Sequence, residues 1–194
     1  MSMTKFVVAL VAAIGCGLIA AQEPSDKEVA KAQEVTRERQ ETLTMAEATI
    51  SRLREEAPES GELIDKAYGY AVFDATKGGL IVSGAGGGGV AQLKGGREPV
   101  FMRMRSVGIG LTAGAESYKL VLLFEDAANY EKFLDGERDF KGSAQGAAGG
   151  AAGGATTSFQ DGVALYHLSD KGLLGNIDVS SVKFSRDKDL NEKV

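Results

Sequence analysis

The first charged stretch of the chain, residues 25–56, has the pattern of an amphipathic helix. Its apolar positions recur at the three-four spacing that places them on one face: Val29, Ala32, Val35, Leu43, Ala46, Ile50 and Leu53. Ser25 with Glu28 three residues later forms a capping box, and Pro58 marks the far end. Arg39 interrupts the apolar stripe, so the pattern leaves open one helix with a bend or two helices.

After a second short helix, predicted over residues 62–67, the pattern changes to strands. Six segments are β-branched, aromatic or alternating: residues 68–73, 79–86, 99–114, 117–124, 163–168 and 176–184. The segment KLVLLF at 119–124 is apolar at successive positions, so both of its faces are expected to be covered. Asp126 is expected to cap a helix over 127–135 that Gly136 ends. The order predicts an α+β fold, with N-terminal helices followed by a curved, glycine-rich antiparallel sheet that stays open or closes toward a barrel.

The glycines of the sheet fall on fixed faces when they are counted by parity. Gly84, Gly86 and Gly88 share one face of their strand, and Gly108 and Gly110 share one face of the next. If the two stripes adjoin, they form a trough without side chains. Three fillers of this trough are open: a sharp curl of the sheet, the alanine-rich residues 144–155 of the low-complexity stretch 142–157, or a lipid acyl chain.

The N-terminus has the composition of an export signal. Lys5 precedes an uninterrupted run of apolar and small residues over 6–21, which predicts a signal peptide of residues 1–21. Alternatively, AIGC at 13–16 is similar to a bacterial lipobox, and Cys16 would then be lipidated and become the mature N-terminus. Either route predicts an exported protein, free in the periplasm or anchored to a membrane as a lipoprotein.

Composition and charge argue against several classes of protein function. The formal net charge of −5 argues against a nucleic-acid-binding protein, which needs a basic surface. Cys16 is the only cysteine, so no intrachain disulfide can form. The glycines at 84–89 spell G-x-G-x-x-G but open no helix, so they do not predict a nucleotide site. His167 is the only histidine, and neither a zinc site nor a Cys–His pair is expected. The chain is therefore not predicted to be an enzyme or to use a cofactor or metal.

Motifs over residues 62–191 occur in an order that resembles the SYLF lipid-binding domain family. They are AYGYAVF, the lysine-glycine step at 77–79 with GAGGGGV, VGIGLTAGAESYKLVLLF, GVALYHLSDKGLLGNIDV, and a late asparagine, Asn191. The resemblance implies a single domain of helices and a curved antiparallel sheet that binds membrane lipid. Eukaryotic members bind phosphoinositides and some bind actin, whereas bacterial members are typically exported or similar to lipoproteins. An exported protein is not expected to meet actin.

These observations give the following organisation: a signal over residues 1–21, a charged helical segment over 22–60, and a SYLF-like domain over 61–194. The expected function is non-catalytic binding of membrane lipid in the bacterial envelope, with anionic or phosphoinositide-type headgroups implied by the resemblance. The cations expected to contact headgroups are Lys77, Lys94, Arg97, Arg103, Arg105 and Lys171, beside the glycines of the trough.

A different class of function is also open. The helical residues 25–57 would bind a protein partner, and the sheet would be a scaffold, so that the chain acts as a structural or assembly protein. An apolar stripe on a charged helix suits a partner helix as well as the helix's own domain.

Overall fold

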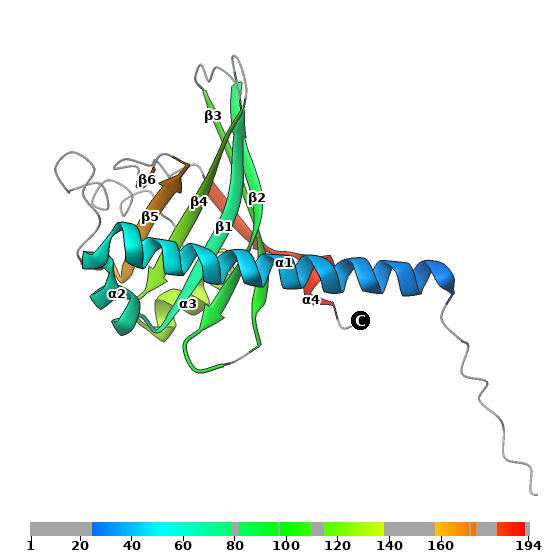
Figure 1. Ribbon diagram of the computed structural model, residues 1–194, viewed down its shortest axis with the longest axis horizontal. Helices are drawn as coiled ribbons and strands as arrows, with labels where there is room; N and C mark the ends of the chain where they lie inside the picture. The colour runs from blue at the N-terminus through cyan, green and yellow to red at the C-terminus, as the bar shows by residue number, and fades with distance from the viewer. Residues whose placement is uncertain are drawn as a thin grey trace, which may run out of the picture.

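The computed structural model shows one open sheet with a long helix across one face and a short helix against the other (Figure 1). It describes residues 25–78, 82–96, 98–109, 115–137, 158–170, 172–173 and 182–192. The predicted signal with Cys16 and the Ala/Gly-rich segment at 142–157 lie outside these residues. The predicted α+β class is confirmed.

The long helix α1 (Asp26–Glu56) is continuous for 31 residues. Its capping box forms as predicted: the Ser25 hydroxyl accepts from the Glu28 amide, and the Glu28 carboxylate accepts from the Ser25 amide at 2.7 Å. Pro58 opens the short helix η1 (Pro58–Ser60), which leads into α2 (Gly61–Lys66). Arg39 therefore neither divides nor ends the helix.

The sheet has the order β6-β5-β4-β1-β2-β3-β7, and every neighbouring pair is antiparallel. The strands are β1 (Gly69–Gly78), β2 (Val82–Leu93), β3 (Val100–Ile109), β4 (Ala115–Phe124), β5 (Val163–Ser169), β6 (Gly172–Leu173) and β7 (Val182–Arg186). A barrel needs its two edge strands to pair. Within the described residues, β6 pairs only with β5 and β7 only with β3, so the alternative of a barrel was wrong.

Both faces of the sheet carry a core, as the sequence of β4 requires. Leu120, Leu122 and Phe124 lie in the cluster beneath the short helix α3 (Ala127–Leu134), whereas Val121 and Leu123 lie in the cluster beneath α1. Each of these strand side chains is fully buried. The prediction that KLVLLF is covered on both faces is confirmed.

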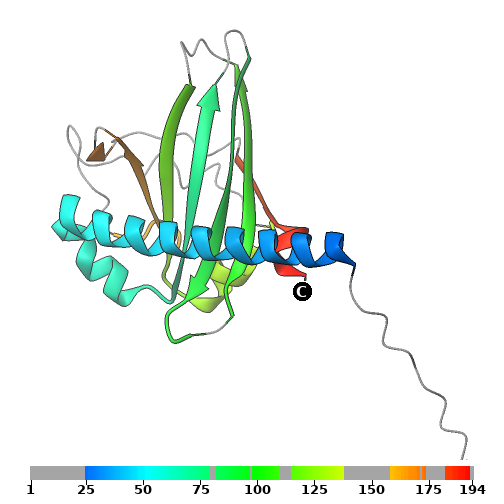
Figure 2. The ribbon, with the colours of Figure 1, turned by 45° about the vertical axis from the view of Figure 1, so that its right-hand side comes forward.

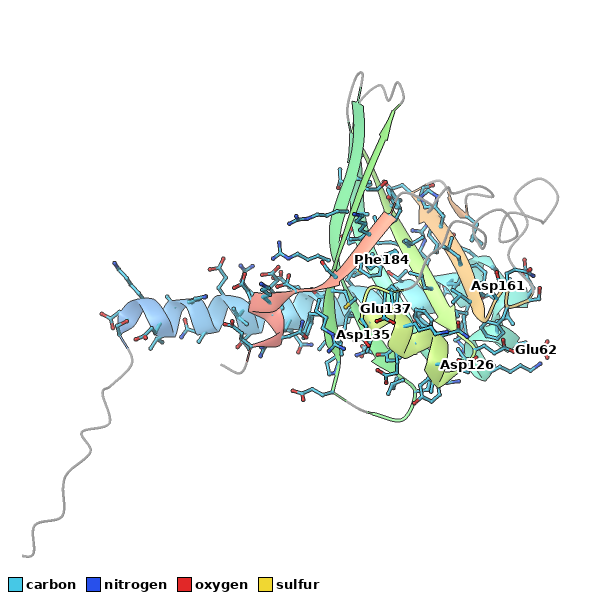
Figure 3. The ribbon with its side chains drawn as sticks, turned by 180° about the vertical axis from the view of Figure 1, so that it is seen from behind. Glu62, Asp126, Asp135, Glu137, Asp161 and Phe184 are labelled. Atoms are coloured by element: carbon cyan, nitrogen blue, oxygen red, sulfur yellow. The ribbon has the colours of Figure 1, made fainter. Side chains whose placement is uncertain are left out.

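The second face is closed by aromatic contacts between α3 and the far edge of the sheet. The Phe133 ring of α3 lies 5.1 Å from the Phe184 ring of β7, and the Phe73 ring of β1 lies 5.0 Å from that of Phe184. Phe184 is labelled in Figure 3, which shows this face of the sheet. Asp126 caps α3 by accepting from the Asn129 amide at 2.8 Å, and Gly136 follows its end with a φ of +71°, as predicted.

The helix α1 leaves part of its face of the sheet uncovered. Its C-terminal half packs on the sheet through Ala46 and Leu53, which are fully buried. The strands β1 to β4 continue past α1, and the N-terminal end of α1 continues past the short C-terminal helix α4 (Lys188–Asn191) (Figures 1 and 2). Among the described helices, none combines the length and apolar character needed to span a bilayer.

Candidate functional site

The glycines of β2 divide into two sets by the face on which they lie. A Cβ on Gly87 would lie 1.8 Å from the Asp74 carbonyl oxygen, and one on Gly89 would lie 2.2 Å from the Val72 oxygen. Only glycine fits at these positions, because the β1 backbone occupies the space of a side chain. These two glycines therefore permit the close approach of β1 and β2.

The even-numbered glycines face open space instead. A Cβ on Gly88 would have nothing within 4 Å, and Cβ atoms on Gly84 and Gly86 would be in ordinary contact, at 3.6 and 3.7 Å, with backbone oxygens of β3. All three positions are exposed on the side of the sheet that α1 partly covers. Packing therefore does not require glycine at these positions, and the bare surface there needs another explanation.

A groove of about 280 Å³ lies over this bare surface, between α1, β3 and the C-terminal segment. Its lining residues are Glu38, Thr42, Gly86, Gly87, Gly88, Arg103, Met104, Arg105, Asp187 and Leu190. The sheet register explains why glycines and arginines meet there: Gly86 is the cross-strand partner of Arg105, and Gly88 is the partner of Arg103. Four of the predicted site residues are thus gathered in one place.

The two arginines differ in their surroundings. Arg103 donates from Nε to the carboxylate of Asp187, which is 3% exposed, and this hydrogen bond raises the pKa of the Arg103 guanidinium. Asp187 also caps α4 by accepting from the Leu190 amide at 3.2 Å. Arg105 is exposed, and no hydrogen bond or ion pair joins it to another described residue. Arg105 therefore contributes a free positive charge to the groove.

The C-terminal wall of the groove is held by hydrogen bonds between side chains and backbone groups. The Asn191 side chain accepts from the Phe101 amide at 3.0 Å and donates to the Phe101 carbonyl at 2.7 Å. Arg39 of α1 donates to the Leu190 carbonyl at 2.8 Å and lies over the Phe101 ring at 6.0 Å. These contacts fix α4 against both β3 and α1 and so set the width of the groove.

Among the other predicted cations, Lys94 is described by the structure and does not line this groove. Lys94 donates to the Ile64 carbonyl at 3.0 Å and to the Asp65 carbonyl, at the end of α2. It lies six residues along β2 from Gly88, or about 20 Å at the rise of a strand. Lys94 therefore lies apart from the glycine surface, and its contact with a headgroup stays a prediction. Lys77 pairs through its backbone with Ala85, but its side chain lies outside the described part, as do Arg97 and Lys171.

The two glycine stripes do not join into one trough. Gly84 pairs with Val107, so Gly108 pairs with Ser83, one position out of phase. Gly108 therefore belongs to the opposite face from Gly84, and the expectation of a joined trough was wrong. Gly110 lies outside the described residues. The register of two neighbouring strands cannot be read from either strand alone.

Sequence reasoning missed the acidic and apolar walls of the groove. Asp187, Leu190, Glu38 and Thr42 come from segments that are distant along the chain and meet only through the order of the strands. A cap signal was present, because Asp187 precedes the three residues Lys188-Asp-Leu190 at the start of α4. That signal predicts the cap, but not the partner on β3.

Thr42 supplies a hydroxyl group to the groove. The Thr42 hydroxyl donates to the Glu38 carbonyl at 2.8 Å, within its own helix. Across the described part of the chain, no three His, Cys, Asp or Glu side chains are grouped to hold a metal ion. His167 lies on β5, away from the groove, with its ring 4.5 Å from that of Tyr118 in an edge-to-face contact.

Two comparisons with known proteins bear on the family of this chain. Residues 105–194 match the Ysc84 family, described as "Las17-binding protein actin regulator". The chain is also similar to beta cell expansion factor A of Aeromonas veronii, with 34% identity over 149 residues that make up 77% of this chain. The chain carries a Ysc84/SYLF domain.

The Ysc84/SYLF domain is associated with lipid binding. The family match begins at Arg105 and so includes one cation of the groove together with β7 and α4. The chain spans 57% of the length of the curated relative that it matches.

Proposed function

We propose that this protein binds anionic membrane lipid, without catalysing a reaction, in the bacterial cell envelope. The observation that carries the proposal is the groove of about 280 Å³ in which Arg103 and Arg105 lie beside their cross-strand partners, the open glycines Gly88 and Gly86. The association of the Ysc84/SYLF domain with lipid binding supports it.

The size and charge of the groove favour a headgroup over an acyl chain. Sites for whole small molecules have volumes of about 300–1,000 Å³, and this groove falls at the lower limit. Arginine matches the oxygens of a phosphate with two parallel hydrogen bonds. The net charge of −5 means that attraction to an anionic surface must come from this local patch and not from the molecule as a whole.

The absence of a catalytic role is part of the proposal. The Thr42 hydroxyl is directed to a backbone carbonyl, and the Asp187 carboxylate is held by Arg103 and by the α4 amide. Neither group is placed as a nucleophile beside a free base. Location in the envelope is supported by the apolar run over residues 6–21 after Lys5, which has the composition of an export signal.

Vesicle flotation tests the proposal with the form that begins at Gln22, as expected after export. We expect this form to float with phosphatidylcholine vesicles that contain an anionic lipid, and not with phosphatidylcholine alone. The variant Gly88→Val fills the groove, and we expect it to lose about tenfold in vesicle affinity. Because a Cβ at this position meets nothing within 4 Å, the variant should fold normally.

A matched control places the same valine side chain on the same face outside the groove. Ser117 is exposed on β4, two strands away from Gly86, and Ser117→Val should bind vesicles as the parent does. Equal binding by the parent and by Gly88→Val would exclude the groove as the lipid site. No binding to any anionic vesicle would exclude the proposed function.

Partner binding through residues 25–57 is the second candidate, and we propose the start of α1 as its site. Ala46 and Leu53 belong to the protein's own core, whereas Val29 is 41% exposed on the end of α1 that extends past the sheet (Figure 2). Deleting residues 25–57 would remove core side chains, so substitution is the better test. Val29→Asp should abolish binding of a protein partner and leave vesicle binding unchanged.

A further inference from the structure

Two positive side chains stand directly opposite each other beside the groove. Arg105 of β3 and Lys183 of β7 are cross-strand partners, and both are exposed. Side chains in such a pair have Cβ atoms about 4.5–5.5 Å apart, and like charges at that distance destabilise the sheet. Lys183 was not among the cations expected from the sequence.

Neighbouring acidic groups do not neutralise this pair. Asp187 is bound to Arg103, and Asp74 forms an ion pair with Lys119 at 2.5 Å. Glu38 of α1 lines the opposite wall of the groove. Within the part of the chain that the structure describes, neither Arg105 nor Lys183 has an ion-pair partner. The pair therefore keeps two positive charges in a protein that is acidic overall.

The cross-strand row that contains the pair has no side chain at the position next to Arg105 on β2. Gly86, Arg105 and Lys183 are successive partners across β2, β3 and β7, on the face that α1 partly covers. Gly86 leaves the Arg105 side chain without a neighbour on that flank. An anion that rests over Gly86 could thus reach the Arg105 guanidinium without displacing a side chain.

We infer that Arg105 and Lys183 together bind a phosphate monoester group over Gly86. A dianion balances two cations, whereas a carboxylate or a phosphodiester would balance one. The planar guanidinium supplies a pair of parallel donors and the ammonium a compact point charge, a combination suited to three phosphate oxygens. The inference rests on the proposed function only for the source of the phosphate. If the proposed function is right, the phosphate belongs to a lipid headgroup; if it is wrong, the same site binds free phosphate.

Thermal unfolding with inorganic phosphate tests the pair without any membrane. A ligand that binds the folded state raises the Tm, so phosphate should raise the Tm of the parent more than chloride at equal ionic strength. Arg105→Met and Lys183→Met should each weaken phosphate binding about tenfold, the usual size of a lost hydrogen bond to a charged group. Both variants should be at least as stable as the parent without phosphate, because like-charge repulsion is removed.

Two controls separate a local site from a general charge effect. Lys132→Met removes the same charge from the exposed surface of α3, against the other face of the sheet, and should leave phosphate binding unchanged. Glu38→Gln removes a carboxylate that lines the opposite wall of the groove and should strengthen phosphate binding severalfold. Equal losses in Lys132→Met and Lys183→Met would overturn the inference, as would a parent Tm that does not respond to phosphate.

Two kinds of vesicle distinguish a lipid headgroup from free phosphate as the source. One contains phosphatidylcholine with phosphatidic acid, a phosphate monoester, and the other contains phosphatidylcholine with phosphatidylglycerol, a phosphodiester. Preference for phosphatidic acid that is lost in Lys183→Met would assign the site to a lipid headgroup. A Tm response to phosphate without binding to either vesicle would support the anion site and contradict the proposed lipid function. Equal binding of both vesicles by parent and variant would leave the lipid function standing and overturn the monoester site.

Discussion

At the scale of single residues, neighbouring glycines of one strand have opposite requirements. Gly87 has the β1 backbone 1.8 Å from where its Cβ would be, and Gly88 has nothing within 4 Å. Gly87→Ala should lower the free energy of unfolding by roughly 1–3 kcal/mol or more, because the sheet must open to admit the methyl group. Gly88→Ala should raise it by about 0.4–1 kcal/mol, because alanine restricts the unfolded chain.

Urea titration of the two alanine variants measures both effects. The pair is internally matched, since each variant adds the same methyl group to the same strand at adjacent positions. Similar free energies of unfolding in the two variants would mean that the close contact of β1 and β2 at Gly87 is wrong.

The sequence predicted the half of the groove that depends on local pattern. Parity alone placed Gly84, Gly86 and Gly88 on one face, and the alternation of methionine with arginine in β3 placed Arg103 and Arg105 on one face. The contribution of Lys183 and Asp187 could not be predicted, because it depends on β7 pairing with β3 some 80 residues earlier along the chain. Pairing between distant strands is decided by packing, which no local pattern encodes.

At the scale of elements, the polar residue that interrupts the apolar stripe of α1 is the residue that contacts the C-terminal segment. Arg39 breaks the apolar stripe of α1, yet it donates to the carbonyls of Leu190 and Glu192 and lies over the Phe101 ring. A polar position in an apolar stripe is tolerated here because it meets backbone acceptors. The capping box and Pro58 fixed the ends of the helix correctly from the sequence.

Removing Arg39 should loosen α4 and leave the sheet intact. Arg39→Met deletes hydrogen bonds from a charged donor, worth about 1.5 kcal/mol, so protection of the Glu192 amide from hydrogen exchange should fall about tenfold. Arg37→Met is the matched control on the same helix, because Arg37 forms only an exposed ion pair with Glu41. Unchanged protection at Glu192 in Arg39→Met would show that α1 does not hold α4.

At the scale of the whole molecule, burial of a tyrosine in the core on the α3 face makes the free energy of unfolding decrease at alkaline pH. Burial, with a smaller effect of Glu131, raises the pKa of Tyr130 to about 12, against about 10 in an unfolded chain. Between these values the unfolded chain has lost the phenolic proton and the folded protein keeps it. The unfolded state then binds fewer protons, so the free energy of unfolding falls as pH rises from about 10 to about 12.

Tyr130→Phe removes this contribution, and its free energy of unfolding should decline less steeply than that of the parent over the same pH range. Urea titrations at several pH values measure the two slopes, and titrations near pH 7 control for the loss of the hydroxyl itself. Parallel slopes from pH 10 to 12 would show that Tyr130 titrates normally in the folded protein.

The molecule as a whole is negatively charged, whereas its groove is lined by positive side chains. The salt concentration sets the distance over which an anionic membrane is affected by each of these charges. The chain carries a net charge of −5, whereas Arg105 and Lys183 form a local positive patch. At about 0.01 M salt the Debye length is about 30 Å, so the negative charges of the whole molecule repel an anionic vesicle. At about 0.1 M salt the Debye length is about 10 Å, and only charges near the contact interact with the vesicle. Flotation with anionic vesicles should therefore be strongest at intermediate salt and weaken on either side. Lys183→Met should reduce that maximum, and a steady rise in binding down to the lowest salt would indicate a basic surface far larger than this groove.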